Sequence, residues 1–137
     1  MSDNNKTILI IEDEETILNM YRLKFEASGF NFLGATTGEE GLKMASQQKC
    51  DVIFVDLMLE NKVEGGVISG YDVISKLRKN NKLSKIYALT NFDQDKSIEQ
   101  AFKIGVDGYL LKSNLIPSEL VAKTRKILAG EKVGVKI

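Results

Sequence analysis

The sequence predicts an α/β fold, a doubly wound, five-stranded parallel sheet with five helices. Three observations predict it. Five short apolar runs lie along the chain, and most are continuous rather than alternating in polarity, as in strands buried on both faces. A segment with helical spacing of its apolar residues follows each run. Strand and helix therefore alternate five times, and right-handed crossovers of such a chain give an open sheet covered on both sides.

The predicted strands are rich in Ile, Val and aromatic residues, which favour sheets. The second run is the weakest, because Asn31 interrupts it, and we expect this strand at an edge of the sheet. The five runs are Ile8–Ile11, Phe30–Leu33, Val52–Val55, Ile86–Leu89 and Tyr109–Leu111.

The predicted helices have recognisable start and stop signals. Thr37 and Glu40 have the spacing of a capping box, and Pro117 suits the first turn of the last helix. Three helix ends are followed by a glycine that lets the chain turn (Gly29, Gly105 and Gly130). The predicted helices cover about 15–28, a segment opened by Thr37, about 71–79, 94–104 and 117–128.

Length and charge restrict the class of protein. The 137 residues suit one domain, and 43% hydrophobic with 28% charged residues is average globular composition. Nineteen basic residues balance nineteen acidic ones, which argues against a broad surface for nucleic acid or anionic membrane. We expect a single domain over residues 1–137, with its core at about 7–130 and a short tail at 131–137.

Residue types that are absent or rare exclude several chemistries. The chain has no histidine, so a Ser-His-Asp arrangement is excluded, and the single cysteine, Cys50, can form no internal disulfide. We expect Cys50 to be a small structural thiol, with a redox switch as the alternative. No apolar run is long enough to span a bilayer and the first residues lack the order of a secretory signal, so we expect a cytoplasmic protein without membrane contact.

Polar residues directly follow four of the five predicted strands. Glu12 and Asp13 follow the first, Asp56 the third, Thr90 the fourth and Lys112 the fifth. The carboxyl ends of parallel strands share one edge of an open sheet, where ligands of such folds bind. Any one of these residues is explained by a solvated loop. Their combination indicates a site.

The predicted site is strongly acidic. Clustered carboxylates repel one another unless positive charge lies among them. A divalent cation together with Lys112 would balance Glu12, Asp13 and Asp56, and carboxylate oxygens favour Mg²⁺, with Mn²⁺ as an alternative. The Thr90 hydroxyl and the Lys112 ammonium would then face whatever lies beside the metal, and both are partners for phosphoryl oxygens.

Four motifs have the order and spacing of a known family: ILIIEDEE, DVIFVDLML, IYALTN and GYLLKS. From about Thr7 to Gly130, the chain resembles the receiver domain of two-component response regulators, the chemotaxis-Y-like family. The resemblance implies a flavodoxin-like sheet with strand order 2-1-3-4-5. It also implies that Asp56 is the phosphoacceptor, a carboxylate nucleophile that forms an aspartyl phosphate. Asp13 and Asp56 would bind Mg²⁺ directly, Met58 through its backbone carbonyl, and Glu12 through water.

The resemblance further implies a switch. Lys112 would pair with the phosphoryl group, Thr90 would donate its hydroxyl after phosphorylation, and Tyr109 would turn inward with it. The phosphoryl group would come from a sensor histidine kinase or a histidine phosphotransfer protein. The face that changes would bind a downstream protein, or a second copy of the chain in a phosphorylation-dependent homodimer. The protein would be a signalling phosphoacceptor rather than an enzyme acting on other substrates.

Three other functions compete with this one. A degenerate receiver would act as an unphosphorylated scaffold. A phosphohydrolase with an aspartyl-phosphate intermediate would need an acid/base carboxylate where Met58 stands. A flavodoxin would need a phosphate-cradling loop, whereas Glu12–Glu15 would repel phosphate.

The chain departs from the family pattern at several positions. Residues 61–66 look like an insertion, either a tolerated surface loop or a partner-specific contact. Ser113 stands where a cis proline usually follows the lysine, so the Lys112–Ser113 bond is either trans or strained. The basic residues between 76 and 85 suggest a solvated helix face, with nucleic-acid contact as the alternative.

Two bulky residues are expected beside the phosphoryl group. Met58 and Phe92 flank the path of an in-line water, and neither side chain can orient a water strongly. We expect slow loss of phosphate, unless Phe92 points away into the fourth helix.

Overall fold

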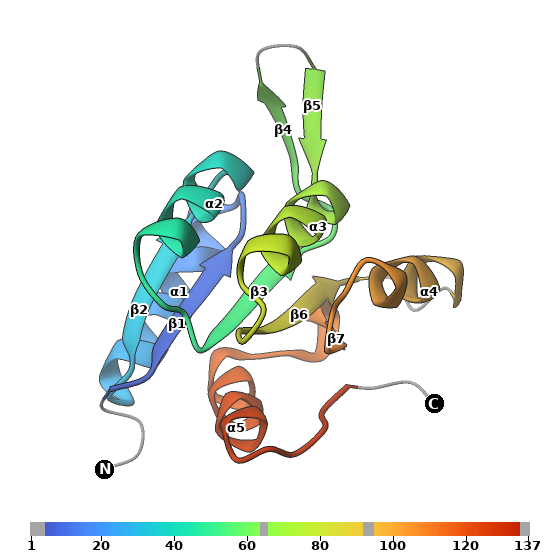
Figure 1. Cartoon of the computed structure of the whole chain (residues 1–137). Helices are drawn as coiled ribbons and strands as arrows, with labels where there is room; N and C mark the ends of the chain where they lie inside the picture. Colours follow the sequence, from blue (N-terminus) through green and yellow to red (C-terminus); the bar gives the residue numbers. More distant parts are fainter. Residues whose placement is uncertain (1–4, 64–65, 92–94, 135–137) are drawn as a thin grey trace.

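The structure is a computed structural model, which describes residues 5–63, 66–91 and 95–134. Its main element is a five-stranded parallel sheet with the order β2-β1-β3-β6-β7 (Figure 1). The predicted parallel sheet is confirmed. The predicted strand order 2-1-3-4-5 is confirmed as well, because β6 and β7 are the fourth and fifth strands of this sheet; β4 and β5 form a separate two-stranded sheet. The strands are β1 (Thr7–Ile11), β2 (Asn31–Ala35), β3 (Val52–Asp56), β6 (Lys85–Thr90) and β7 (Gly108–Leu111).

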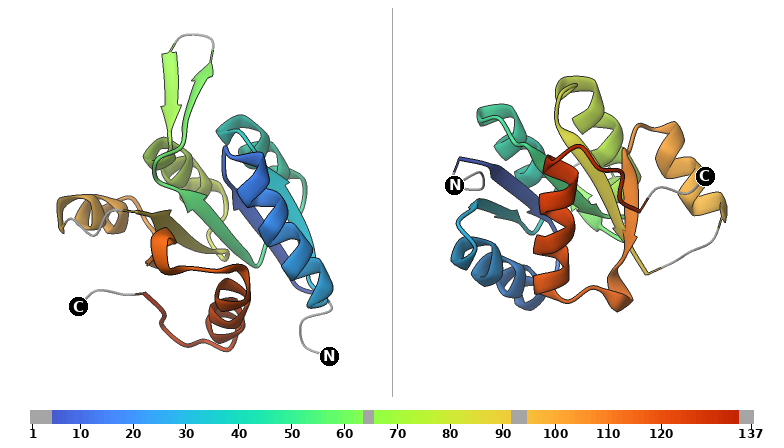
Figure 2. Two further views of the ribbon diagram at one scale, coloured as in Figure 1. Left: turned by 180° about the vertical axis from the view of Figure 1, so that it is seen from behind. Right: turned by 90° about the horizontal axis from the view of Figure 1, so that it is seen from below.

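Helices cover both faces of the sheet (Figure 2). One apolar layer joins the sheet to α1 and α5, through residues such as Phe25 and Leu120. The other layer joins it to α2, α3 and α4, through residues such as Ile74 and Ala101. The helices are α1 (Glu15–Ala27), α2 (Gly38–Gln47), α3 (Gly70–Asn80), α4 (Asp95–Lys103) and α5 (Pro117–Leu128). Among the described helices, none has the length and apolar character needed to cross a bilayer.

Local signals explain most helix starts. The Thr37 hydroxyl accepts a hydrogen bond from the Glu40 N–H, as the capping-box spacing predicts, and Pro117 opens α5. A full capping box that the sequence analysis did not identify opens α3, where Ser69 and Asp72 bond reciprocally. This capping box fixes the direction in which α3 begins, directly after the chain segment that links Asp56 to Ser69.

The described residues on either side of positions 64–65 form an antiparallel hairpin of β4 (Glu60–Val63) and β5 (Gly66–Ser69). Part of the predicted insertion at 61–66 is therefore in β-strands; whether it is a tolerated surface loop or a partner-specific contact stays a prediction. The hairpin stands away from the sheet (Figure 1), but its base is tightly closed. The Gly70 N–H donates to the Leu59 carbonyl at 3.0 Å, and a Cβ at Gly70 would lie 2.5 Å from the Asp56 carbonyl oxygen.

The basic residues between 76 and 85 do not form one uniform solvated face. Arg78 turns toward the protein, where Nη2 lies 2.7 Å from Oδ2 of Asp107 and Nε donates to the Gly105 carbonyl at 2.8 Å. Nη1 also donates to the Ser84 carbonyl at 3.0 Å. For Arg78 the expected solvated role is wrong, because its guanidinium group satisfies carbonyls of two loops.

Candidate functional site

The predicted polar residues meet at the carboxyl edge of the sheet. Glu12 directly follows β1, Asp56 ends β3, Thr90 ends β6 and Lys112 directly follows β7. The register brings these ends to one level, since Asp56 pairs with Leu89 and Thr90 pairs with Leu111. Their shared edge follows from parallel pairing, as the sequence predicts.

Lys112 holds two carboxylates together. Its Nζ lies 2.5 Å from Oε1 of Glu12 and 3.1 Å from Oδ2 of Asp56. Glu12 is fully buried and Asp56 is 3% exposed. Buried charges of this kind are stable only when they are paired and hydrogen-bonded, and Lys112 supplies both conditions.

Backbone amides satisfy the remaining carboxylate oxygens. The Met58 N–H donates to Oδ1 of Asp56 at 2.9 Å, and the Glu14 N–H donates to Oε2 of Glu12 at 3.1 Å. These bonds fix the orientation of both carboxylates from within their own loops. The Met58 side chain is 52% exposed beside them.

Burial and charge shift two pKa values in the site. Burial raises the pKa of Glu12, and the hydrogen bond from Lys112 opposes this rise without cancelling it. Burial would lower the pKa of Lys112, but its hydrogen bond to Glu12 and the charge of Asp56 outweigh burial and raise it. The ammonium group is therefore held in its charged form.

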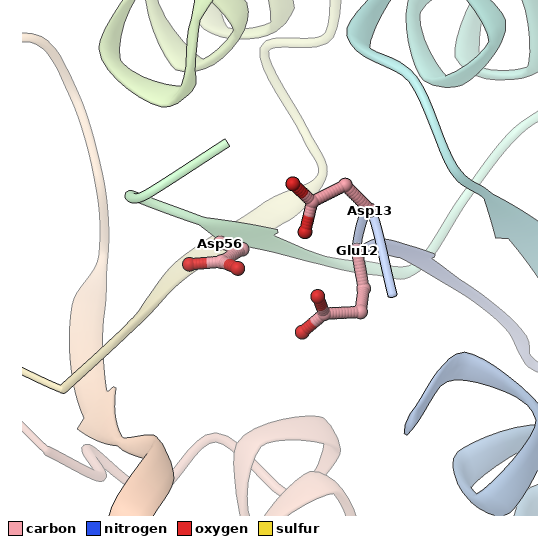
Figure 3. Close-up of side chains that lie close together, drawn as sticks. All are labelled: Glu12, Asp13 and Asp56. Atoms are coloured by element: carbon pink, nitrogen blue, oxygen red, sulfur yellow. The ribbon is translucent and has the colours of Figure 1, made fainter. Parts of the chain in front are cut away.

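Three carboxylates of the site could hold a metal ion. One oxygen each of Glu12, Asp13 and Asp56 lie within 4.8 Å of one another, and Figure 3 shows the three groups around a common space. Their three negative charges exceed the single charge of Lys112 by two, which a divalent cation would balance. The exposed Asp13 gives the cluster an open side. This all-oxygen donor set fits Mg²⁺.

The two residues expected to switch lie on neighbouring strands. Thr90 is buried at the end of β6, and Tyr109 is half-buried on β7, opposite Ala88. The Tyr109 ring meets that of Phe102 on α4 edge to face, with centroids 6.4 Å apart. Tyr109 thus links the strand that precedes Lys112 to a helix on one face of the sheet.

The chain after Lys112 adopts an ordinary backbone. A short 3₁₀ helix spans Lys112–Asn114, and no described peptide bond is cis. The Lys112–Ser113 bond is therefore trans, which resolves the alternative left open by the sequence. Phe92 lies outside the described residues, so the structure does not test the expectation for its side chain.

Sequence reasoning missed Tyr21 as a neighbour of the site. Its spacing in α1 identifies it as a core residue, and its ring does pack in the layer between the sheet and α1. Burial raises the pKa of its hydroxyl, and the charges of Lys112, Glu12 and Asp56 also act on it. No pattern in the sequence signals this proximity, because it depends on how α1 crosses the end of β1.

The geometry agrees with comparisons to known protein families. Residues 8–125 match the response regulator receiver domain. The chain belongs to this family. The acidic cluster of this receiver domain, made by Glu12, Asp13 and Asp56, is typical of the family's phosphorylation site.

Two curated relatives of this receiver domain are bacterial regulators. The alkaline phosphatase synthesis transcriptional regulatory protein PhoP of Bacillus subtilis is 32% identical over 129 residues, which cover 94% of this chain and 51% of PhoP. The response regulator SaeR of Staphylococcus epidermidis is 30% identical over 122 residues, which cover 89% of this chain and 50% of SaeR. The chain thus spans about half the length of these relatives.

Solved structures confirm the receiver fold. A CheY-like receiver domain protein from Methanospirillum hungatei superposes with a TM-score of 0.81 at 23% identity, covering 91% of this chain and 94% of that one. A response regulator from Burkholderia pseudomallei superposes with a TM-score of 0.73 at 30% identity, covering 91% of this chain and 72% of that one. The Burkholderia structure contains a phosphorylated aspartic acid and a calcium ion.

Proposed function

We propose that this receiver domain accepts a phosphoryl group on Asp56 from a phosphohistidine of a partner protein. The observation that carries the proposal is the position of Asp56, buried at the end of the central strand β3 with the Lys112 ammonium 3.1 Å away. In the transfer, the phosphorus–nitrogen bond of the donor breaks and a phosphorus–oxygen bond to Asp56 forms. The imidazole is the leaving group and remains part of the donor's histidine; this chain itself contains no histidine.

Each neighbouring residue has a proposed role in this transfer. Lys112 neutralises charge on the phosphoryl oxygens, and the Met58 N–H holds the Asp56 carboxylate in a fixed orientation. Thr90 donates its hydroxyl to the phosphoryl group once that group is attached. Positioning and electrostatic stabilisation account for nearly all catalysis of phosphoryl transfer, and these groups supply both.

Mg²⁺ is the proposed metal of the site. Asp13 and Asp56 would bind it directly, Glu12 through water, and Met58 through its backbone carbonyl. When bound, the ion supplies positive charge that stabilises the phosphoryl oxygens during transfer. The oxygen donors and the excess negative charge of the cluster support this assignment.

The proposed output is a change of surface. Phosphorylation would draw Thr90 toward Asp56 and let Tyr109 turn inward, which alters the face formed by α4 and the adjoining strands. That face would bind a downstream protein or a second copy of the chain. We place the protein in the cytoplasm as a signalling module, with a sensor histidine kinase or histidine phosphotransfer protein as its donor.

Labelling with a small phosphodonor tests the proposal directly. Incubation with acetyl phosphate and Mg²⁺ should give an alkali-labile, hydroxylamine-sensitive phosphate, and Asp56→Asn should abolish it. Asp51→Asn is the matched control, because Asp51 immediately precedes β3 and therefore lies at the amino end of the strand that Asp56 ends. Equal labelling of the Asp56→Asn variant and the parent would overturn the assignment.

A further inference from the structure

The described chain after α5 folds back onto the sheet. Residues 131–134, which we name the C-terminal strap, run from the end of α5 to the outer edge of β7 (Figure 2). The Tyr109 N–H donates to the Gly134 carbonyl at 3.0 Å. Because β7 is the last strand of the sheet, the strap bonds to an edge that the other strands do not cover.

Two glycines allow the strap to approach this closely. A Cβ on Gly134 would collide with the Tyr109 carbonyl oxygen, and a Cβ on Gly108 would lie 2.7 Å from the Val133 carbonyl oxygen. Gly134 also has a φ of 61°, in the left-handed region that favours glycine. The fit between strap and strand therefore depends on small residues on both sides.

Val133 anchors the middle of the strap. Its side chain is half-buried against the apolar layer formed by the sheet, α1 and α5. Its backbone hydrogen-bonds to Tyr87 on β6, which opposes the rise that burial causes in the pKa of that tyrosine. The strap thus contacts two neighbouring strands.

One short strand connects the strap to the acidic site. β7 has four residues, Gly108–Leu111; its beginning contacts the strap, and Lys112 follows its end. Lys112 pairs with Glu12 and Asp56 in this structure. A shift of β7 that moves Lys112 or Tyr109 therefore also changes the strap contacts.

We propose that the C-terminal strap restrains β7 and Tyr109 in the arrangement of the unphosphorylated protein, so that strap release and phosphoryl binding at Asp56 favour each other. This inference rests on the proposed function, in which Lys112 neutralises charge on the phosphoryl oxygens and Tyr109 turns inward. Coupling between two sites is reciprocal. Loss of the strap contacts should therefore tighten binding of a phosphoryl analogue at a site more than one strand away.

Beryllofluoride with Mg²⁺ is the probe, titrated against the full chain. Gly134→Ala removes the close approach, Val133→Ser removes the apolar anchor, and Lys132→Ala is the control because Lys132 is an exposed strap residue. Hydrogen exchange of the Tyr109 amide reports independently whether the strap has been released. Both strap variants should accelerate this exchange and bind beryllofluoride about two- to ten-fold more tightly, the net effect of one hydrogen bond. Lys132→Ala should match the parent in both measurements.

The measurements distinguish failure of the strap coupling from failure of the proposed phosphorylation of Asp56. Tyr109 exchange that accelerates without tighter beryllofluoride binding would overturn the coupling, and unchanged exchange in both variants would show that the strap does not hold the strand. Either result, with normal binding by the parent, leaves phosphorylation of Asp56 intact. A parent protein that binds no beryllofluoride would instead overturn the proposed function and the coupling with it.

Discussion

The Lys112 ammonium lies 2.5 Å from Oε1 of Glu12, closer than the 3.1 Å that separates it from the proposed phosphoacceptor. Lys112 is thus a structural cation of the buried cluster before any phosphoryl group arrives. Its side chain is 13% exposed, so water screens these charges only weakly.

Replacement of Lys112 should expose this structural role. Lys112→Met leaves two buried carboxylates without their cation, and we expect the free energy of unfolding to fall by about 3–5 kcal/mol. Saturating Mg²⁺ should restore much of this loss, because it places positive charge in the same cluster. Urea unfolding with and without Mg²⁺ measures both effects, and equal losses in the two conditions would contradict a shared charge balance.

Asp13 should contribute to metal binding more than to folding. Asp13→Asn removes a repelling charge from the open side of the cluster, so stability without metal should change by less than about 1 kcal/mol. The added stability that Mg²⁺ gives the parent should disappear. Thermal unfolding over a magnesium titration tests this, with Glu14→Gln as a control; an unchanged titration would transfer the metal role to Glu12.

The raised pKa of Glu12 predicts a pH dependence with a definite sign. The folded protein holds the Glu12 proton more tightly than the unfolded chain, so Glu12 favours folding most below its ordinary pKa of 4.5. This contribution is lost as pH rises through the raised value. The free energy of unfolding, measured without metal from pH 4 upward, should include this decline in the parent and lack it in Glu12→Gln. Identical pH profiles would show that another group is responsible.

The same proton competes with the metal. As pH falls toward 4.5, Glu12 should be protonated earlier than an ordinary glutamate, and Mg²⁺ affinity should weaken over that range. Isothermal titration at several pH values measures the effect. In Glu12→Gln the affinity should be lower throughout and depend less on pH in that interval.

Cys50 should be chemically inert in the folded protein. Burial, and secondarily the charge of Asp51, raise the pKa of its thiol to about 11. Compared with the ordinary value of 9.0, this pKa reduces the reactive thiolate about a hundred-fold. Labelling with a disulfide reagent at pH 8 should therefore be at least this much slower than in urea. Rapid labelling of the native chain would favour the redox alternative.

The lifetime of the proposed aspartyl phosphate tests the effect of Met58. Its exposed thioether beside Asp56 orients water poorly, so Met58→Asn, alone or with Phe92→Glu, should speed phosphate loss by up to about ten-fold. Leu83→Asn is the control, since Leu83 is an exposed apolar side chain on the α3–β6 loop. Decay at the parental rate at saturating Mg²⁺ would remove the shielding hypothesis.

The sheet and the site edge were predictable because both depend on local signals. Continuous apolar runs identify buried parallel strands, and the residue after each run must lie at the shared edge, which placed Asp56 and Lys112 correctly. The preference of Lys112 for Glu12 was not predictable, because it depends on the distances between side chains of different strands.

Other features lack such a signal. β4 and β5 have four residues each and include Glu, Asn, Lys and Gly, which have low strand propensity, so their pairing was not apparent. The strap contains one apolar residue, Val133, and its partners lie on remote strands. Arg78 has the spacing of a surface residue, and only the loops packed around it reveal its carbonyl partners.

Because the base of the β4–β5 hairpin is closed, the length of the hairpin does not affect the architecture of the five-stranded sheet. A backbone hydrogen bond joins Leu59, just before the hairpin, to Gly70, just after it. The positions of the sheet strands therefore do not depend on how many residues lie between Leu59 and Gly70. We therefore expect that this segment can be lengthened, shortened or exchanged without changes in the core. At the base of the hairpin the margin is small, because even a methyl group added at Gly70 would lie 2.5 Å from the carbonyl oxygen of Asp56.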